Sequence, residues 1–104
     1  MFSTDLPADS PEFDAIKQAA AEYFKLSLEQ LTGAGKARQV AHARQIAMYL
    51  AKQMTSRSLP EIGRRFGGRD HTTIMHGVKK IEELRSADRS LAEDIDLLRR
   101  LLEA

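Results

Sequence analysis

The stretch Ser58–Ile81, SLPEIGRRFGGRDHTTIMHGVKKI, decides the fold, because it contains two helix starts separated by a pair of glycines. The first helix is predicted to follow Ser58 as its N-cap, and Glu61, three residues on, completes a capping box. Pro60 falls in the first turn, where its missing backbone N–H has no helical partner to lose. Gly67-Gly68 then ends this short helix.

The second helix of the stretch begins directly after the glycines, with Asp70 as its N-cap. Two helices joined by a glycine-containing turn of about four residues form the helix-turn-helix arrangement. In that arrangement the second helix lies in the major groove of DNA, and its N-terminal residues reach the base edges. The residues so placed are Asp70, His71, Thr72 and Thr73, with His76 one turn later, while Ile74, Val78, Ile81 and Leu84 face inward.

These polar side chains have the chemistry that base recognition needs. Aspartate accepts from the amino group of cytosine, threonine offers a hydroxyl and a methyl that contacts thymine, and histidine donates to an acceptor edge. The basic residues around them that suit phosphates are Arg64, Arg65, Arg69, Lys79 and Lys80. A purely structural interpretation stays open, in which Asp70 is only a cap and Thr72 and Thr73 are first-turn surface residues.

Helical spacing continues on both sides of this stretch. Upstream, the pattern predicts a helix through 13–24, a short turn capped by Ser27, a break at 32–35 and a long helix over 40–54. Downstream, the cap pattern S-x-x-E that starts at Ser90 opens a last helix. Strand-like alternation does not occur, so the predicted fold is all-α: a helical bundle with a helix-turn-helix.

Composition bounds the remaining choices. The chain has 104 residues and no cysteine, which fits one small domain and excludes disulfides and thiol nucleophiles. Residues 1–12 are predicted to form a flexible acidic N-terminal lead-in, and residues 13–104 the folded domain. No apolar run is long enough to cross a membrane, and the N-terminus lacks the basic start of a signal peptide. We therefore expect no membrane partner and a cytoplasmic location, which DNA binding would make nucleoid-associated.

Charge is segregated along the chain, although the net charge is only +1. Residues 32–80 hold ten Lys and Arg against two acids, a balance of +8. Residues 1–31 hold two bases against six acids, and residues 81–104 hold four against seven. A strongly basic centre favours a polyanion partner. The alternative is that the acidic ends fold back and neutralise the centre.

Enzymatic function is not expected. His71 and His76 are five residues apart, so they do not share the helix face that an i, i+4 metal pair needs. No nucleophile stands with a base and an orienting partner. The run Gly33–Ala37 fails the G-x-x-x-x-G-K-[ST] pattern of a phosphate loop. The sequence therefore predicts no catalytic residue, no metal and no cofactor.

The stretch Ile62–Ile81, with GGRDHTT as its most specific part, closely resembles the C-terminal DNA-binding domain (domain IV) of the bacterial chromosomal replication initiator, DnaA. The resemblance extends upstream through AHARQIAMYL (41–50) and TSRSLPE (55–61), and covers about residues 13 to 103. It implies a TrpR-like helix-turn-helix bundle that binds double-stranded DNA. The expected target is the DnaA box, a short asymmetric AT-rich element of the TTATNCACA type, typically bound by a monomer.

The resemblance also implies a role for each matching residue. Asp70, His71 and Thr72 would read bases in the major groove, while Lys36 and Arg38 would enter the adjacent AT-rich minor groove. The residues expected to contact the DNA backbone are Arg44, Gln45, Lys52, Thr55, Leu59, Pro60, Arg69, Thr73 and His76.

Three positions depart from the family pattern. Lys36 stands where the family usually has Arg, so the planar guanidinium fork is missing there. Ala43 replaces the usual Pro, and Gly77 replaces the usual Ala at a cost of about 1 kcal/mol in helix stability. These departures indicate a diverged member of the family.

Two other functions remain open. In the first, the acidic segments 1–31 and 81–104 bind the full-length initiator or one of its regulators, and the helix-turn-helix is only a scaffold. In the second, the protein is a diverged transcription regulator with a shifted target sequence. The length leaves no room for the initiator's ATPase module, and both a naturally short protein and an excised initiator domain fit it.

Overall fold

The structure, a computed structural model, describes residues 13–33, 35 and 37–103. Within these ranges the secondary structure is entirely helical, which confirms the all-α prediction. The six helices are α1 (Phe13–Phe24), α2 (Leu28–Thr32), α3 (Arg38–Met54), α4 (Leu59–Arg65), α5 (His71–Ala87) and α6 (Arg89–Glu103). The predicted lead-in at 1–12 and the predicted minor-groove residue Lys36 lie outside the described residues.

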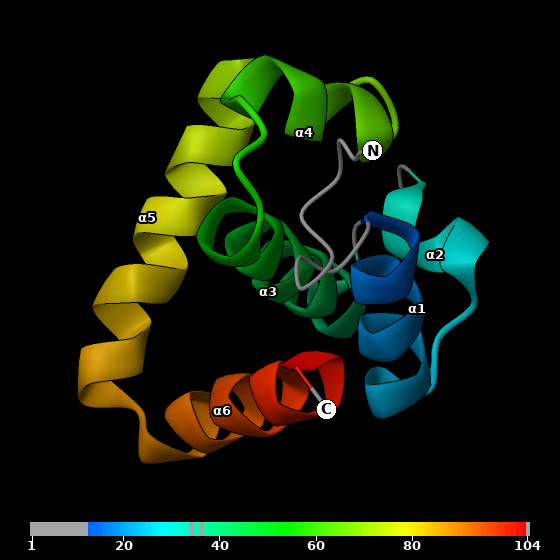
Figure 1. The fold of residues 1–104 in the computed structure, drawn as a ribbon. Coiled ribbons are helices and arrows are strands. Elements are labelled where there is room, and N and C mark those ends of the chain that lie inside the picture. Colours follow the sequence, from blue (N-terminus) through cyan, green and yellow to red (C-terminus); the bar gives the residue numbers. More distant parts are fainter. Residues whose placement is uncertain (1–12, 34, 36, 104) are drawn as a thin grey trace, which may run out of the picture.

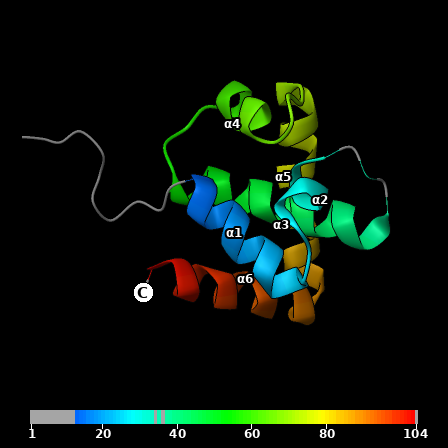
Figure 2. The same cartoon turned by 90° about the vertical axis from the view of Figure 1, so that its right-hand side faces the viewer.

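Helix α3 runs through the centre of the bundle, and the other helices pack around it (Figure 1). Helix α5 packs mainly against α3 and α4, and α1 packs against α3 and α6. The corner between α4 and α5 lies at one end of the molecule and α6 at the other (Figure 2). In the described ranges, no helix has the length and apolar content needed to cross a membrane.

The core is built from the apolar stripes that the sequence predicts. Its largest fully buried side chains come from all six helices and the α4–α5 turn: Ile16, Leu31, Ile46, Tyr49, Leu50, Ile62, Phe66, Ile74, Ile81, Leu91, Ile95 and Leu98. Leu84 is exposed, so the prediction that it faces inward is wrong. It is rotated about 60° around the helix from Ile81 and falls at the edge of the buried stripe.

Side-chain caps start α2 and α4, as predicted. The Ser27 hydroxyl accepts from the backbone N–H of Gln30, whose side chain completes a capping box. The Ser58 hydroxyl accepts from the N–H of Glu61 at 3.3 Å. The second half of the box predicted for α4 is wrong, because the Glu61 carboxylate pairs with Arg57 and Arg65 at 3.5 and 3.7 Å.

Helix α6 begins earlier than predicted, because Asp88 caps it and Ser90 does not. The Asp88 carboxylate accepts from the N–H of Leu91 at 3.2 Å. The N–H of Asp88 also donates to the Leu84 carbonyl at 2.7 Å, which ends α5. One residue therefore serves both helix ends.

The turn between α4 and α5 has a backbone that only glycine adopts easily. Gly67 and Gly68 have φ values of +82° and +75°. After them, the N–H of Arg69 donates to the Gly63 carbonyl at 2.8 Å, which pulls the turn back onto α4. The result is a sharp corner that presents the start of α5 to solvent.

Candidate nucleic-acid interface

The N-terminus of α5 presents polar side chains to solvent. Asp70 caps the helix by accepting from the N–H of Thr72 at 3.2 Å. Its other carboxylate oxygen lies 3.6 Å from Nδ1 of His71. The two side chains are 67% and 56% exposed, so capping leaves both of them accessible to a partner.

The carboxylate of Asp70 is held in its charged form. Hydrogen bonding to Thr72 is the main reason that the pKa of Asp70 lies below its ordinary value, and the neighbouring His71 lowers it further. An ionised carboxylate only accepts hydrogen bonds. Asp70 therefore matches a donor such as the amino group of cytosine and repels a phosphate.

Beside this helix start, a hollow of about 100 Å³ lies between α3 and α5. Its polar lining comes from α3, from the turn and from α5: Arg44, Gln45, Arg69 and Thr73. Ala41, Met48 and Gly77 complete it. The fold thus brings together four residues that the sequence analysis assigned to the DNA backbone, although Arg44 and Thr73 are 29 positions apart in the chain.

Arg44 is only 6% exposed, and it is the one buried charged residue in the described part of the chain. Its Nε donates to the Leu31 carbonyl at 2.7 Å, and its two terminal nitrogens donate to Gln30 and Gly35 at 3.0 and 3.1 Å. Burial, and then the nearby charge of Arg69, lower its pKa. Three of its five N–H donors are therefore committed to the protein, and the geometry favours a bracing role over a free phosphate contact.

Arg69 is half-buried and also bonds inward. Its guanidinium donates to the carbonyls of Thr32, Gly33 and Phe66. Burial lowers its pKa. Within the described ranges neither Arg69 nor Arg44 has a carboxylate within 4.0 Å, so carbonyl dipoles alone balance the two charges.

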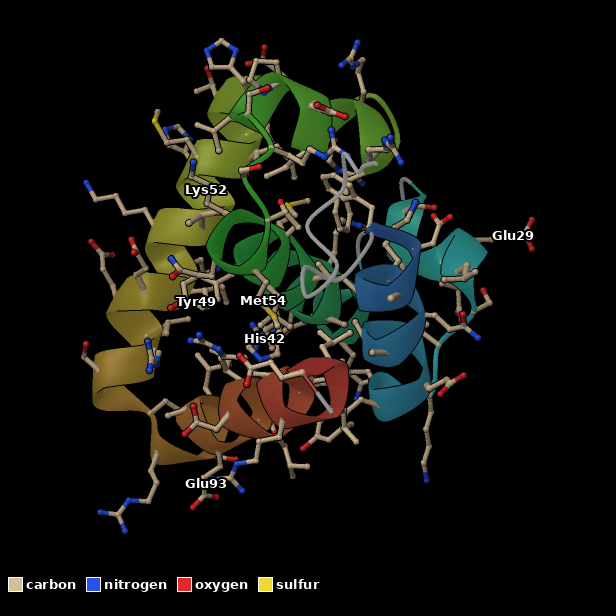
Figure 3. All side chains as sticks on the ribbon, in the orientation of Figure 1. Glu29, His42, Tyr49, Lys52, Met54 and Glu93 are labelled. Carbon is tan, nitrogen blue, oxygen red and sulfur yellow. The ribbon has the colours of Figure 1, made fainter. Side chains whose placement is uncertain are left out.

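Other cations extend the basic surface on both sides of the hollow. Arg64 on α4 and Lys79 and Lys80 on α5 are exposed. Lys52 projects from α3 near α5, whereas the acidic Glu93 lies on α6 at the opposite end of the molecule (Figure 3).

The remaining predicted residues lie around this surface with different accessibility. Arg38 is exposed at the start of α3, and His76 is exposed on α5. The Thr55 hydroxyl donates to the Ala51 carbonyl at 2.6 Å and accepts from the N–H of Arg57, which occupies it at the end of α3. The half-buried Leu59 and the exposed Pro60 open α4.

Sequence reasoning missed two features of this surface. Met75, on α5 between His71 and Lys79, is exposed although it is apolar. Gly77 lines the hollow, and a Cβ there would meet the Gln45 and Met48 side chains at 3.5 and 3.6 Å. The inward bonding of Arg44 had a signal in the sequence, since Arg44 stands between Ala43 and Ala47 on the buried side of its helix.

A helix-turn-helix corner with an accessible polar helix start and a basic surround defines a DNA-binding protein of the helix-turn-helix class. The family model described as "Bacterial dnaA protein helix-turn-helix" matches residues 13–81. The chain belongs to this family, which confirms the resemblance found in the sequence. The family's domain is a DNA-binding domain without catalytic activity.

The chain is similar to proteins named "Chromosomal replication initiator protein DnaA". It is 60% identical over 91 residues to that of Cereibacter sphaeroides (strain ATCC 17029 / ATH 2.4.9), an alignment that covers 88% of the chain and 20% of the relative. Identity is 57% over 91 residues for Ruegeria pomeroyi, covering 88% and 19%. It is 52% over 89 residues for Brucella abortus biovar 1, covering 86% and 18%. The chain spans about a fifth of the length of these relatives.

Proposed function

We propose that this chain binds double-stranded DNA at DnaA-box-like sites of the TTATNCACA type, in or as a regulator of chromosomal replication initiation. The observation that carries the proposal is a juxtaposition. Two guanidiniums without a described carboxylate partner line a hollow directly beside the accessible Asp70 and His71. Family membership and the similarity to replication initiators support the same target.

In this proposal, the start of α5 reads bases. Asp70 accepts from a cytosine amino group, His71 donates to an acceptor edge, and Thr72 contacts a base through its hydroxyl or methyl. Lys36 and Arg38 enter the adjacent minor groove, where a narrow AT-rich groove attracts cations. One monomer would thus contact two neighbouring grooves of an asymmetric site.

The hollow is a suitable seat for one phosphate of the DNA backbone. The Gln45 amide and the Thr73 hydroxyl line it, together with the N–H groups of Arg44 and Arg69 that are not bonded to backbone carbonyls. Around it, Lys52 and His76 meet further phosphates. Thr55 at the end of α3, and Leu59 and Pro60 at the start of α4, contact the same strand of the DNA.

The test is a fluorescence anisotropy titration of a labelled box duplex and a scrambled duplex at low and near-physiological salt. We expect the wild type to prefer the box by a margin that survives added salt. His71→Ala and Asp70→Asn should each weaken box binding by about 1–3 kcal/mol and leave scrambled binding nearly unchanged. Asparagine keeps the helix cap but turns an acceptor into a donor, which separates base reading from the loss of the cap.

Lys52→Ala and Asp88→Asn are the matched controls. Lys52→Ala should weaken both duplexes alike and reduce the salt slope by about 1. Asp88→Asn makes the same chemical change at the other end of α5 and should leave DNA binding unaltered. Equal binding of box and scrambled duplexes that collapses with salt would contradict the proposal and leave only electrostatic attraction.

A second candidate function is docking onto the full-length initiator or one of its regulators. Leu97 and Leu101 are 44% and 57% exposed on α6, which also carries acidic residues. An exposed apolar pair on a charged helix suits a protein partner. A pull-down with full-length initiator in nuclease-treated solution tests the first of these partners. Capture that Leu101→Asp abolishes supports docking onto the initiator, and absence of any complex contradicts it.

A further inference from the structure

Helix α2 ends without a cation of its own. It has five residues (Leu28–Thr32) and no basic residue in its last turn. The last carbonyls of a helix lack partners inside the helix, and positive charge stabilises that end. In this molecule the partners come from two other elements, α3 and the α4–α5 turn.

Arg44 and Arg69 share these carbonyls between them. Arg44 takes those of Gln30, Leu31 and Gly35. Arg69 takes those of Thr32 and Gly33. Every described residue from 30 to 35 thus has its carbonyl bonded to one of the two guanidiniums. We call this set of bonds the arginine clasp.

The clasp joins elements that are far apart in the sequence. Arg69 and Thr32 are 37 residues apart, and Arg44 and Gln30 are 14 apart. The backbones also meet directly, since a Cβ on Gly67 would lie 2.4 Å from the Thr32 carbonyl oxygen. The turn of the helix-turn-helix is therefore seated on the end of α2 with no space between them.

Both partners in the clasp, the turn that holds Arg69 and the residues 30–35, are close in the chain to residues predicted to contact DNA bases or grooves. Arg69 directly precedes Asp70, the cap of α5, and residues 30–35 lead into α3 at Arg38. We infer that Arg69 and Arg44 are positioning residues that fix the distance between the base-reading start of α5 and Arg38, the described member of the predicted minor-groove pair. The inference rests on the proposed function and adds that the residues for the major groove and for the minor groove are held together as one rigid unit.

The geometry of the guanidinium, and not its charge alone, is what this role requires. Arg69 reaches three carbonyls with one planar group. Lysine keeps the positive charge but has no fork and cannot bridge the same set. Arg69→Lys therefore separates a positioning role, which lysine loses, from a phosphate contact, which lysine retains.

The first experiment is a double-mutant cycle in box binding, with wild type, Arg38→Ala, Arg69→Lys and the double variant. In the wild-type background Arg38→Ala should weaken binding about tenfold. In the Arg69→Lys background the same change should weaken binding less than about threefold, because Arg38 is no longer held at a fixed distance from the start of α5. The salt slope of Arg69→Lys should equal that of the wild type, since the charge remains.

The control cycle pairs Lys52→Ala with Arg69→Lys. Lys52 is near the other end of α3, about 21 Å along the helix from Arg38. The loss of affinity caused by Lys52→Ala should therefore add to the loss caused by Arg69→Lys. Additive losses in the Arg38 cycle would overturn the inference. A wild type that shows no preference for the box would instead contradict the proposed function.

A second measurement tests the clasp without DNA. Amide hydrogen exchange of Leu31 and Thr32 in the free protein should speed up at least about tenfold in Arg69→Lys, while exchange in α6 stays unchanged. Arg85→Lys is the matched control, because Arg85 donates to the Tyr49 hydroxyl at 3.1 Å on a surface away from α2. Unchanged exchange at the end of α2 would overturn the inference whatever the DNA result.

Discussion

An aspartate N-cap lies at each end of α5, one in basic surroundings and the other in acidic surroundings. Asp70 accepts from the N–H of Thr72 and Asp88 from the N–H of Leu91, both at 3.2 Å. Asp70 follows Arg69 and lies at the basic end of the bundle. Asp88 opens α6, where acids outnumber bases. Both residues are helix caps, so capping alone does not indicate a DNA contact. The charge of the surroundings is what makes Asp70 a candidate DNA-reading residue and Asp88 a structural one.

The two junctions also differ in how tightly the backbone is packed. Between α5 and α6 a single residue, Asp88, makes the connection. Between α4 and α5 the turn folds back on α4, and a Cβ on Gly63 would lie 2.0 Å from the Arg69 carbonyl oxygen. The angle at which α5 is presented therefore depends on backbone contacts that no side-chain adjustment can relieve.

The largest effect is expected from filling that contact. Gly63→Ala should destabilise the fold by about 3 kcal/mol, since the new Cβ must push backbone atoms apart. Urea unfolding followed by circular dichroism measures the change in the free energy of unfolding. Gly77→Ala is the matched control: its Cβ meets only flexible side chains at ordinary contact distance, so it should stabilise by up to about 1 kcal/mol. Equal effects of the two substitutions would show that the α4–α5 corner is not tightly packed.

A smaller effect comes from removing each cap. Asp70→Ala and Asp88→Ala should each lower the free energy of unfolding by about 1 kcal/mol, because each leaves a first-turn N–H without its acceptor. Their consequences for DNA should differ: only Asp70→Ala should weaken binding to the box. Paired urea unfolding and anisotropy measurements on both variants check this. A loss of box affinity in Asp88→Ala as large as in Asp70→Ala would mean that stability, and not base reading, governs binding.

Local features of the fold were predictable from the sequence because their causes are local. The caps Ser27, Ser58 and Asp70 act on N–H groups two or three residues away, and the inward stripes follow from helix periodicity. The cap of α6 was predicted at Ser90 because that residue carries an S-x-x-E pattern. Asp88 takes the position because it also ends α5, which only the joined helices reveal.

The candidate site was less predictable, because its connections are long-range. Charge counting treats every arginine as a solvent-exposed cation, yet Arg44 is buried and Arg69 half-buried against carbonyls. Nothing in the spacing of Arg69 and Thr32 indicates that they meet. The sequence placed Asp70, His71 and Thr72 at the start of a helix, and the DNA contacts of these and the other site residues stay predictions.

The smallest effect is the pH dependence that sets Asp70 apart. Hydrogen bonding to Thr72 keeps its pKa in the folded state below the ordinary value of 3.8. The stability from this charge is therefore fully present above 3.8 and is lost as the pH falls through the lowered folded value. Asp70→Asn keeps the cap without the charge, so its stability deficit relative to the wild type should shrink as urea unfolding is repeated at successively lower pH. Because the side chain is exposed, the change should be smaller than the loss of the cap itself. If the stability deficit of Asp70→Asn instead grows on acidification, the fold prefers the protonated form of Asp70. Asp70 would then be a poor hydrogen-bond acceptor for a DNA base.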